Sequence, residues 1–363
     1  MRRLSETLAR LLRAQSPSGP TSHTSRLTEF DRPFRNPGQL RAWTYLPAEI
    51  APSSPLVVVL HGCTQTAGSY DHHTGWSELA DRCGFALLFA EQQRSNNANG
   101  CFNWFAPPDY QAGQGEVASI AAMTQAVQQA YALDESRTYI TGLSAGGAMA
   151  SACLAAYPDL FAGGAIIAGL PYACASTIPE AFERMRGQGL QHAHTLQASL
   201  RAASPSRRGE WPSISVWHGS SDATVSSTNQ NAIIDQWSGV LGVAAESESE
   251  PVSPGCRRQQ FVDRAGRVRI EAYRIEGMAH GTPIDASDIG RPGPFMLDVG
   301  VSSTRIIAAS WGLHEDPARA SIPASATAPA SVAPTARPPH PSNPPDFVSE
   351  TITNALRSAG LMR

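Results

Sequence analysis

The sequence predicts a single α/β domain in which helices cover both faces of a mostly parallel sheet. The first observation is the run Leu56-Val57-Val58-Val59-Leu60, which is short and wholly apolar, as expected of a strand buried on both faces of a parallel sheet. The second is the alternation of strand-like and helix-like segments around it, which is typical of crossover helices packed on such a sheet. The third is the composition: 42% hydrophobic and 16% charged residues among 363 allow a large core and exclude global disorder.

The elements can be placed in order along the chain. Strands are expected over about 40–46, 56–60, 85–90, 137–141, 165–168 and 214–217, and helices over about 117–131, 145–157 and 226–241. Residues 259–275 fit a hairpin that turns at residues 263–266. Residues 302–311 fit a last helix with Ser302 at its N-cap, where a hydroxyl can accept a backbone N–H.

Changes in composition divide the chain. The expected parts are a Ser/Pro/Thr-rich leader at 1–38, a main domain at 39–313, a Pro/Ala/Ser-rich linker at 314–345 and a C-terminal helix at 346–363. Residues 175–210 interrupt the alternation with two helix-like pieces, so we expect a small helical cap inserted into the main domain. Val348, Ile352 and Leu356 fall on one face of the C-terminal helix, which favours its docking on the domain.

Charge and targeting signals narrow the class of protein. The net charge of −3 is close to neutral, which excludes the basic footprint of a nucleic-acid binder. All 28 basic residues are arginine, so a catalytic lysine is excluded. No segment approaches the roughly 20 apolar residues of a membrane span, and residues 1–13 lack the apolar core of a signal peptide. We therefore expect a cytoplasmic protein, with an extracellular one as the alternative; the composition fixes no oligomeric state.

The strongest chemical signal is Gly142-Leu143-Ser144-Ala145-Gly146-Gly147, which follows an expected strand and precedes an expected Ala-rich helix. This is the G-x-S-x-G pattern in the strand–turn–helix context of a nucleophile elbow. The glycines are needed because the serine is held in a strained turn with no room for bulk on either side. The pattern predicts the α/β-hydrolase fold, with Ser144 as nucleophile.

A serine hydroxyl needs a base to take its proton. Among ten histidines, His280 lies just beyond the expected hairpin and before the last helix, where this fold presents its histidine loop. Asp222 lies between serine and histidine in chain order, in the loop after the strand that ends near Trp217, so it is expected to orient the imidazole. Asp235 and Asp263 are alternatives within a helix and a turn, and His218 is expected to be structural.

An oxyanion hole requires two N–H groups, one after the nucleophile and one after an early strand. Ala145 supplies the first, and Cys63 in His61-Gly62-Cys63-Thr64-Gln65 supplies the second. Cys63 as nucleophile is the alternative, disfavoured because Ser144 already claims His280. The six cysteines show no metal-ligand spacing, and no metal or organic cofactor is implied. Cys101 and Cys174 are expected to lie close enough for a disulfide, although a cytoplasmic location favours free thiols.

Four motifs together resemble the polyhydroxybutyrate-depolymerase family of esterases, which also contains feruloyl and acetyl-xylan esterases. They are the 61–65 segment, Cys101-Phe102-Asn103-Trp104-Phe105, the elbow and Ala168-Gly169-Leu170-Pro171-Tyr172, within a resemblance over about 40–313 and the C-terminal helix. The resemblance implies the triad and oxyanion hole named above and a cleft floored by Asn103 and Trp104. A buried core tryptophan is the alternative for Trp104.

These residues favour a carboxylic-ester hydrolase that forms an acyl-enzyme and acts on short-chain esters or hydroxyalkanoate oligomers. A feruloyl or acetyl-xylan esterase and a serine peptidase of the same fold are alternatives, as is a non-catalytic granule-binding protein, which an intact triad disfavours. A separate polymer-binding module normally holds crystalline polyester, and residues 346–363 are too few to form one. Little action on crystalline film is therefore expected.

Overall fold

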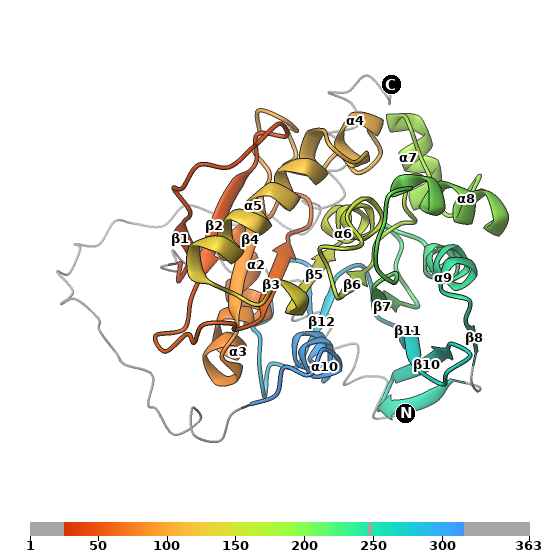
Figure 1. Ribbon diagram of the computed structural model, residues 1–363. Helices are drawn as coiled ribbons and strands as arrows, with labels where there is room; N and C mark the ends of the chain where they lie inside the picture. Colours follow the sequence, from red (N-terminus) through yellow and green to blue (C-terminus); the bar gives the residue numbers. More distant parts are fainter. Residues whose placement is uncertain (1–24, 246–248, 316–363) are drawn as a thin grey trace, which may run out of the picture. The chain divides into compact units, whose positions relative to one another are not determined.

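The computed structural model describes residues 25–245 and 249–315, and in this part of the chain one large sheet is covered by helices on both faces (Figure 1). Its strands are β1 (Thr28–Glu29), β2 (Arg41–Tyr45), β3 (Leu56–Leu60), β4 (Ala86–Glu91), β5 (Thr138–Leu143), β6 (Gly163–Ile167), β7 (Ser213–Gly219), β8 (Ala244–Ala245), β9 (Glu250–Ser253), β10 (Cys256–Val262) and β11 (Val268–Ile275). The order is β1-β2-β4-β3-β5-β6-β7-β11-β10-β8, with β9 beside β10. The six central strands, β4-β3-β5-β6-β7-β11, are parallel, and the strands on either side of them pair antiparallel.

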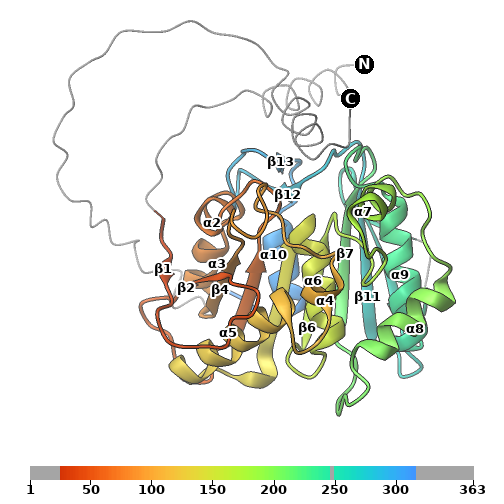
Figure 2. The same ribbon diagram turned by 90° about the horizontal axis from the view of Figure 1, so that it is seen from above.

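Two helical layers cover the sheet, each over its own hydrophobic core (Figure 2). One layer contains α5 (Gly115–Tyr131), α6 (Ala145–Ala156), α8 (Ala193–Ala203) and α9 (Thr228–Leu241), and the other contains α2 (Ala67–Thr74), α3 (Trp76–Cys83) and α10 (Ser303–Ser310). The short helices α4 (Pro107–Tyr110) and α7 (Ile178–Met185), the 3₁₀ turn η1 (Glu135–Arg137) and the pair β12 (Thr282–Ile284) and β13 (Met296–Asp298) complete the described elements.

The sheet confirms the α/β-hydrolase fold expected from the alternation. Every side chain of β3 is buried, because the strand lies between β4 and β5 with a helical layer on each face. The hairpin of β10 and β11 and the Ser302 cap, which accepts the Arg305 N–H at 3.3 Å, form as the sequence predicts. Helices α2 and α3 are additional to the expected elements: α2 carries polar residues such as Asp71 and His72 without an apolar period, and α3 spans only eight residues.

Both helices of the 175–210 insertion form, but α8 joins a layer of the domain. Gln236 of α9 donates to the Leu196 carbonyl at 3.0 Å, and Gln197 of α8 donates to the Asp235 carbonyl at 2.8 Å. Leu196 and Leu200 are buried in the core that α6 and α9 share. The second half of the insertion therefore extends the helical layer.

The described domain also reaches further toward the N-terminus than residue 39. Strand β1 pairs with β2, and Leu27 and Phe30 beside it are buried. Residues 1–24 of the expected leader, most of the linker and the C-terminal helix at 346–363 lie outside the described residues. No helix of the described part is long and apolar enough to cross a bilayer.

Candidate active site

Ser144 occupies a sharp turn between β5 and α6. Its backbone has φ 57° and ψ −117°, a conformation that L-residues rarely adopt. Its N–H donates to the Ile167 carbonyl of β6 at 2.8 Å, which secures the turn to the sheet. A Cβ on Gly142 would lie 2.4 Å from the Gly146 carbonyl oxygen, and one on Gly146 would lie 2.5 Å from the His61 carbonyl oxygen. Glycine is therefore required on both sides of the serine, as the elbow pattern predicts.

The three residues selected by chain order meet at one end of the sheet. His280 Nε2 lies 2.9 Å from Ser144 Oγ, and His280 Nδ1 lies 2.7 Å from Asp222 Oδ2. Both distances are those of hydrogen bonds. The alternatives Asp235 and Asp263 lie elsewhere, in α9 and in the β10–β11 turn. Serine, histidine and aspartate therefore form one hydrogen-bonded chain with the polarity that a base-activated nucleophile needs.

The loops that carry Asp222 and His280 are joined mainly through main-chain groups. The Ser221 N–H donates to the Met278 carbonyl at 3.0 Å, and the Gly277 N–H donates to Ser220 Oγ at 2.8 Å. The two loops approach so closely that a Cβ on Gly219 would lie 2.2 Å from the Met278 carbonyl oxygen. The strand β7 and the histidine loop are thus held in register by backbone geometry.

Asp222 is surrounded by donors. Its Oδ1 accepts the N–H groups of Thr224 at 2.9 Å and Val225 at 2.8 Å, and its Oδ2 faces His218 Nε2 at 3.5 Å as well as His280. Burial acts to raise the pKa of Asp222, but hydrogen bonds from His218, His280 and the Val225 N–H outweigh it and hold that pKa below its ordinary value. The carboxylate stays ionised beside the histidine. His218, expected to be structural, also donates to the Val225 carbonyl at 2.8 Å.

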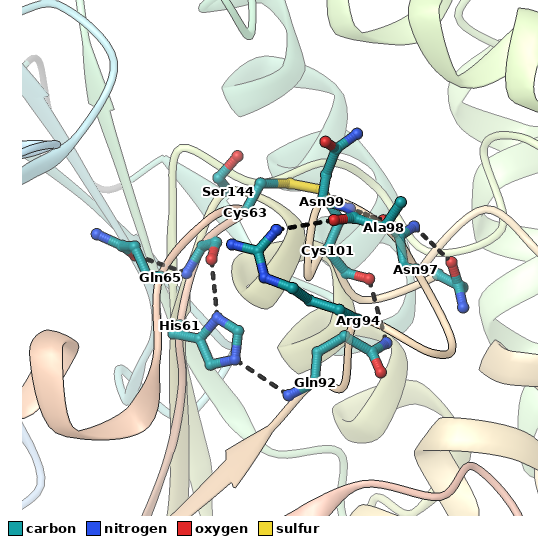
Figure 3. The surroundings of a disulfide bond; sticks show 12 residues. His61, Cys63, Gln65, Gln92, Arg94, Asn97, Ala98, Asn99, Cys101 and Ser144 are labelled. Carbon is teal, nitrogen blue, oxygen red and sulfur yellow. Dashed lines mark hydrogen bonds between the residues drawn. A yellow bond between two sulfur atoms is a disulfide. The ribbon is translucent and has the colours of Figure 1, made fainter. Parts of the chain in front are cut away.

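A disulfide joins Cys63 and Cys101, with their Cα atoms 4.2 Å apart (Figure 3). The expected pairing of Cys101 with Cys174 is wrong, because Cys174 is a free and buried thiol. The physical reason is the strand order. Cys63 follows β3 and Cys101 follows β4, and these strands are neighbours, whereas Cys174 follows β6 on the far side of β5. The disulfide ties the loop beside Ser144 to the segment that contains Asn103.

The segment 61–65 lies against the elbow and is held at several points. The Gly62 N–H donates to Gln65 Oε1 at 2.8 Å, and the Thr64 N–H donates to the Asn99 carbonyl at 2.8 Å. Gln65 Nε2 donates in turn to the Pro294 carbonyl at 3.3 Å. Within residues 25–245 and 249–315, the N–H groups of Cys63 and Ala145 donate to no protein acceptor. A role of both N–H groups in binding an oxyanion stays a prediction.

The side chains of Asn103 and Trp104 mainly contact other residues of the protein. The Asn103 side chain accepts from Asn97 at 2.9 Å and donates to Glu116 Oε1 at 2.8 Å, while its N–H donates to Glu116 Oε2 at 2.9 Å. Trp104 is buried in the core and packs edge-on against Phe105. A role of Asn103 and Trp104 in binding substrate stays a prediction.

Sequence reasoning assigned no role to three buried polar residues beside the site: His61, which it named only as part of the 61–65 motif, Gln92 and Glu116. Glu116 lies in the first turn of α5, next to the apolar face that defined this helix. Burial, reinforced by the nearby Asp109, raises the pKa of Glu116 to about 8 despite hydrogen bonds from Asn103 and Gln92. The one signal for His61 is its place directly after a buried strand. Among the described residues, no cluster of His, Cys, Asp and Glu is arranged as a metal site.

This fold and this serine–histidine–aspartate geometry define a hydrolase of the α/β-hydrolase class. Among solved structures, an acetyl xylan esterase from Aspergillus awamori superposes with a TM-score of 0.67 at 21% identity, over 79% of this chain and 99% of that one. That likeness shows the fold.

Sequence comparison narrows the class to one family. Residues 41–250 match the model of the family described as Esterase PHB depolymerase. Poly(3-hydroxyalkanoate) depolymerase C of Paucimonas lemoignei is 39% identical over 79% of this chain and 70% of its own length. Feruloyl esterase B of Talaromyces stipitatus is 32% identical over 74% and 75%, and an acetylxylan esterase of Coprinopsis cinerea is 27% identical over 76% and 74%. The chain belongs to the esterase PHB depolymerase family and is a carboxylic ester hydrolase.

Proposed function

We propose that Ser144, His280 and Asp222 hydrolyse carboxylic esters through an acyl-enzyme. Ser144 Oγ attacks the ester carbonyl carbon while His280 Nε2 takes the hydroxyl proton, and the carbonyl π electrons move onto oxygen. The N–H groups of Cys63 and Ala145 bind the resulting oxyanion. Asp222 keeps the proton on His280 Nδ1 and stabilises the imidazolium. The observation that carries this proposal is the pair of hydrogen bonds, 2.9 Å from His280 to Ser144 and 2.7 Å from His280 to Asp222.

Collapse of the tetrahedral intermediate completes the first half of the reaction. The C–O bond to the alcohol breaks, and His280 Nε2 transfers its proton to the departing alkoxide oxygen. In the second half, a water molecule loses a proton to His280 and attacks the acyl carbon. The same proton then returns to Ser144 Oγ as the acid leaves. Each step uses side chains of this chain, and the chemistry requires no metal ion or organic cofactor.

The proposed substrates are short-chain esters and hydroxyalkanoate oligomers. This choice is supported by the 39% identity to a poly(3-hydroxyalkanoate) depolymerase. A second candidate, hydrolysis of feruloyl or acetyl esters of xylan, is supported by the feruloyl and acetylxylan esterase relatives. Both candidates require the same triad and differ only in the acyl and alcohol groups that the cleft accepts.

A substrate panel tests this proposal. The purified protein should hydrolyse p-nitrophenyl acetate and butyrate faster than the octanoate and should cleave a 3-hydroxybutyrate trimer. A higher kcat/KM for methyl ferulate or acetylated xylan than for the trimer would favour the second candidate. A p-nitroanilide peptide and a crystalline polyester film serve as negative controls. No hydrolysis of any ester, together with no labelling of Ser144 by a fluorophosphonate, would contradict the assigned activity.

We further propose that the protein matures in an oxidising compartment, in place of the expected cytoplasm. The Cys63–Cys101 disulfide supports this location, because such bonds persist outside reducing compartments. Thiol titration of the denatured protein should detect the four free cysteines Cys83, Cys153, Cys174 and Cys256. Six reactive thiols in protein isolated without reductant would contradict the proposal.

A further inference from the structure

His61 follows β3 directly and is fully buried next to the active-site loop. Its Nε2 lies 3.1 Å from the Gln92 backbone N–H, and its Nδ1 lies 2.8 Å from the Gly62 carbonyl oxygen (Figure 3). The Gln92 N–H can only donate, so Nε2 must be the unprotonated nitrogen that accepts. The proton of the neutral imidazole therefore resides on Nδ1 and is donated to the Gly62 carbonyl.

The environment keeps this tautomer in place. Burial lowers the pKa of His61, and this effect exceeds the opposite influence of the Gly62 carbonyl and of Glu91. A proton on Nε2 would also face the Gln92 N–H. The imidazole therefore remains a neutral donor–acceptor pair that joins the end of β3 to the end of β4.

The Gly62 carbonyl belongs to the same planar unit as the Cys63 N–H. None of the described peptide bonds is cis, and in a trans peptide the C=O and N–H point in opposite directions. A donor that holds the Gly62 oxygen on the His61 side therefore directs the Cys63 N–H away from His61. Ser144 lies in the surroundings of the Cys63–Cys101 bond.

Gln92 connects this peptide to the other end of the disulfide. Its backbone N–H fixes the ring of His61, while its side-chain Nε2 donates to the Cys101 carbonyl at 3.1 Å and to Glu116 Oε1 at 2.5 Å. One residue at the end of β4 thus positions both the peptide before Cys63 and the disulfide partner of Cys63.

We infer that His61 is a positioning residue for the oxyanion hole: its Nδ1–H holds the Gly62 carbonyl, and so aims the Cys63 N–H at the oxygen that becomes negative. This inference rests on the proposed function. His61 touches no reacting atom, and it acts through the orientation of one peptide unit. Misalignment of that N–H weakens binding of the transition state more than binding of the neutral ester.

Two amide substitutions separate the roles of the two ring nitrogens. In His61→Asn the amide nitrogen occupies the place of Nδ1, so a donor to Gly62 is retained while the acceptor for Gln92 is lost. In His61→Gln the amide group reaches the place of Nε2, so an acceptor for Gln92 is retained while the donor to Gly62 is lost. Both variants lose the ring that packs 5.1 Å from Phe102, so both should lower the melting temperature. Val127→Ala, a buried position in the second half of α5, is the control for general destabilisation.

Steady-state rates normalised to fluorophosphonate-titrated sites give the first readout. His61→Gln should lower kcat by roughly 10- to 100-fold, part of the effect of deleting an oxyanion donor, with KM for p-nitrophenyl acetate changed less than about twofold. His61→Asn should retain kcat within about fivefold. The inhibition constant of a trifluoromethyl ketone, whose adduct carries an oxyanion, should rise in His61→Gln by the factor by which kcat/KM falls. Equal losses of kcat in His61→Gln and His61→Asn would overturn the inference. So would a lower fraction of protein that the fluorophosphonate labels, with an unchanged kcat per labelled site.

Amide hydrogen exchange gives a second readout that does not depend on activity. Exchange in the peptide that covers residues 61–65 should quicken in His61→Gln and stay close to wild type in His61→Asn and Val127→Ala. If the wild-type protein hydrolyses no ester but the exchange pattern is as expected, the proposed function is wrong, whereas the inference that His61 orients the Gly62–Cys63 peptide stands. Unchanged exchange in His61→Gln would refute this role of His61, even if the enzyme is active.

Discussion

The two halves of the proposed active site are held in different ways. The loops of Asp222 and His280 are joined mainly through backbone atoms, by the Ser221 N–H on the Met278 carbonyl and by the close approach of Gly219. The oxyanion side is held mostly by side chains, namely the His61 imidazole, the Gln65 amide and the Cys63–Cys101 disulfide, with one backbone bond from the Thr64 N–H to the Asn99 carbonyl.

This difference decides which substitutions each half tolerates. Backbone bonds form with almost any side chain, so, apart from the Asp222 and His280 side chains themselves, this half is sensitive mainly where added atoms would separate the loops. Side-chain bonds are lost one at a time, so the oxyanion half should weaken in steps. Single substitutions in the triad should therefore abolish most of the activity, whereas single substitutions around the oxyanion hole should each lower kcat in part.

The largest effect is expected from removal of the reacting groups. Ser144→Ala or His280→Ala should lower kcat by roughly 10⁶, and Asp222→Asn by about 10⁴, because the asparagine leaves the imidazole in place with the wrong tautomer preference. Steady-state hydrolysis of p-nitrophenyl butyrate measures these losses, with circular dichroism to verify folding. More than a tenth of wild-type activity in His280→Ala would show that another base acts.

A methyl group between the two backbone-held loops should have the next largest effect. In Gly219→Ala the new Cβ would lie 2.2 Å from the Met278 carbonyl oxygen, so the histidine loop must shift. A displacement of about 1 Å can cost roughly 10²-fold in rate, which the rate of fluorophosphonate labelling would reveal. Gly209→Ala, whose nearest neighbour is Asp159 Oδ1 at 3.2 Å, is the matched control. Equal labelling rates in the two variants would refute the proposed role of the close approach.

Loss of the disulfide should have a smaller effect on rate. The Cys63→Ala/Cys101→Ala double variant removes a cross-link between residues 38 apart, and loop-closure entropy alone gives a loss of about 4 kcal/mol in unfolding free energy. We expect kcat to fall only roughly tenfold, because the side-chain bonds of His61 and Gln65 remain. Urea denaturation and kcat measure the two effects. The control variant Cys256→Ala, at a buried free thiol, should change neither the unfolding free energy nor kcat strongly. A 10⁴-fold loss of kcat in the double variant would show that the disulfide alone holds the loop.

The last effect, which concerns stability and not turnover, involves pH and Glu116. The buried carboxyl keeps its proton up to a pKa of about 8, whereas the unfolded chain releases it near 4.5. Between these values the native state binds more protons, so the free energy of unfolding should fall as pH rises, by at most about 1.4 kcal/mol per pH unit. Glu116→Gln should flatten this slope, as measured by denaturation from pH 5 to 8. An unchanged slope would show that other groups set it.

Chain order and loop position select Ser144, Asp222 and His280 because the fold presents each member after a particular strand, and the structure brings these three side chains within hydrogen-bond distance, while their catalytic roles stay a prediction. The cysteine pairing was not predictable in this way. It depends on which strands are neighbours, and the order β4-β3-β5-β6 is a tertiary property that no local pattern encodes. The β3–β4 adjacency, once known, selects Cys63 and Cys101 immediately.

The supporting residues were missed for a different reason. His61, Gln92 and Glu116 are polar residues that interact with one another across separate segments. A polar side chain at a strand end or in a first helical turn is normally exposed, so no local pattern marks these three residues as buried. Their hydrogen bonds join segments that only the tertiary structure brings together.

The tight elbow has a consequence for efforts to diversify this enzyme. At Gly142, Gly146 and Gly147 an added Cβ would lie within 3 Å of a backbone oxygen atom. Almost no substitution at these three positions should therefore give a folded protein in a mutant library. Randomisation there would consume sampling without yielding folded clones.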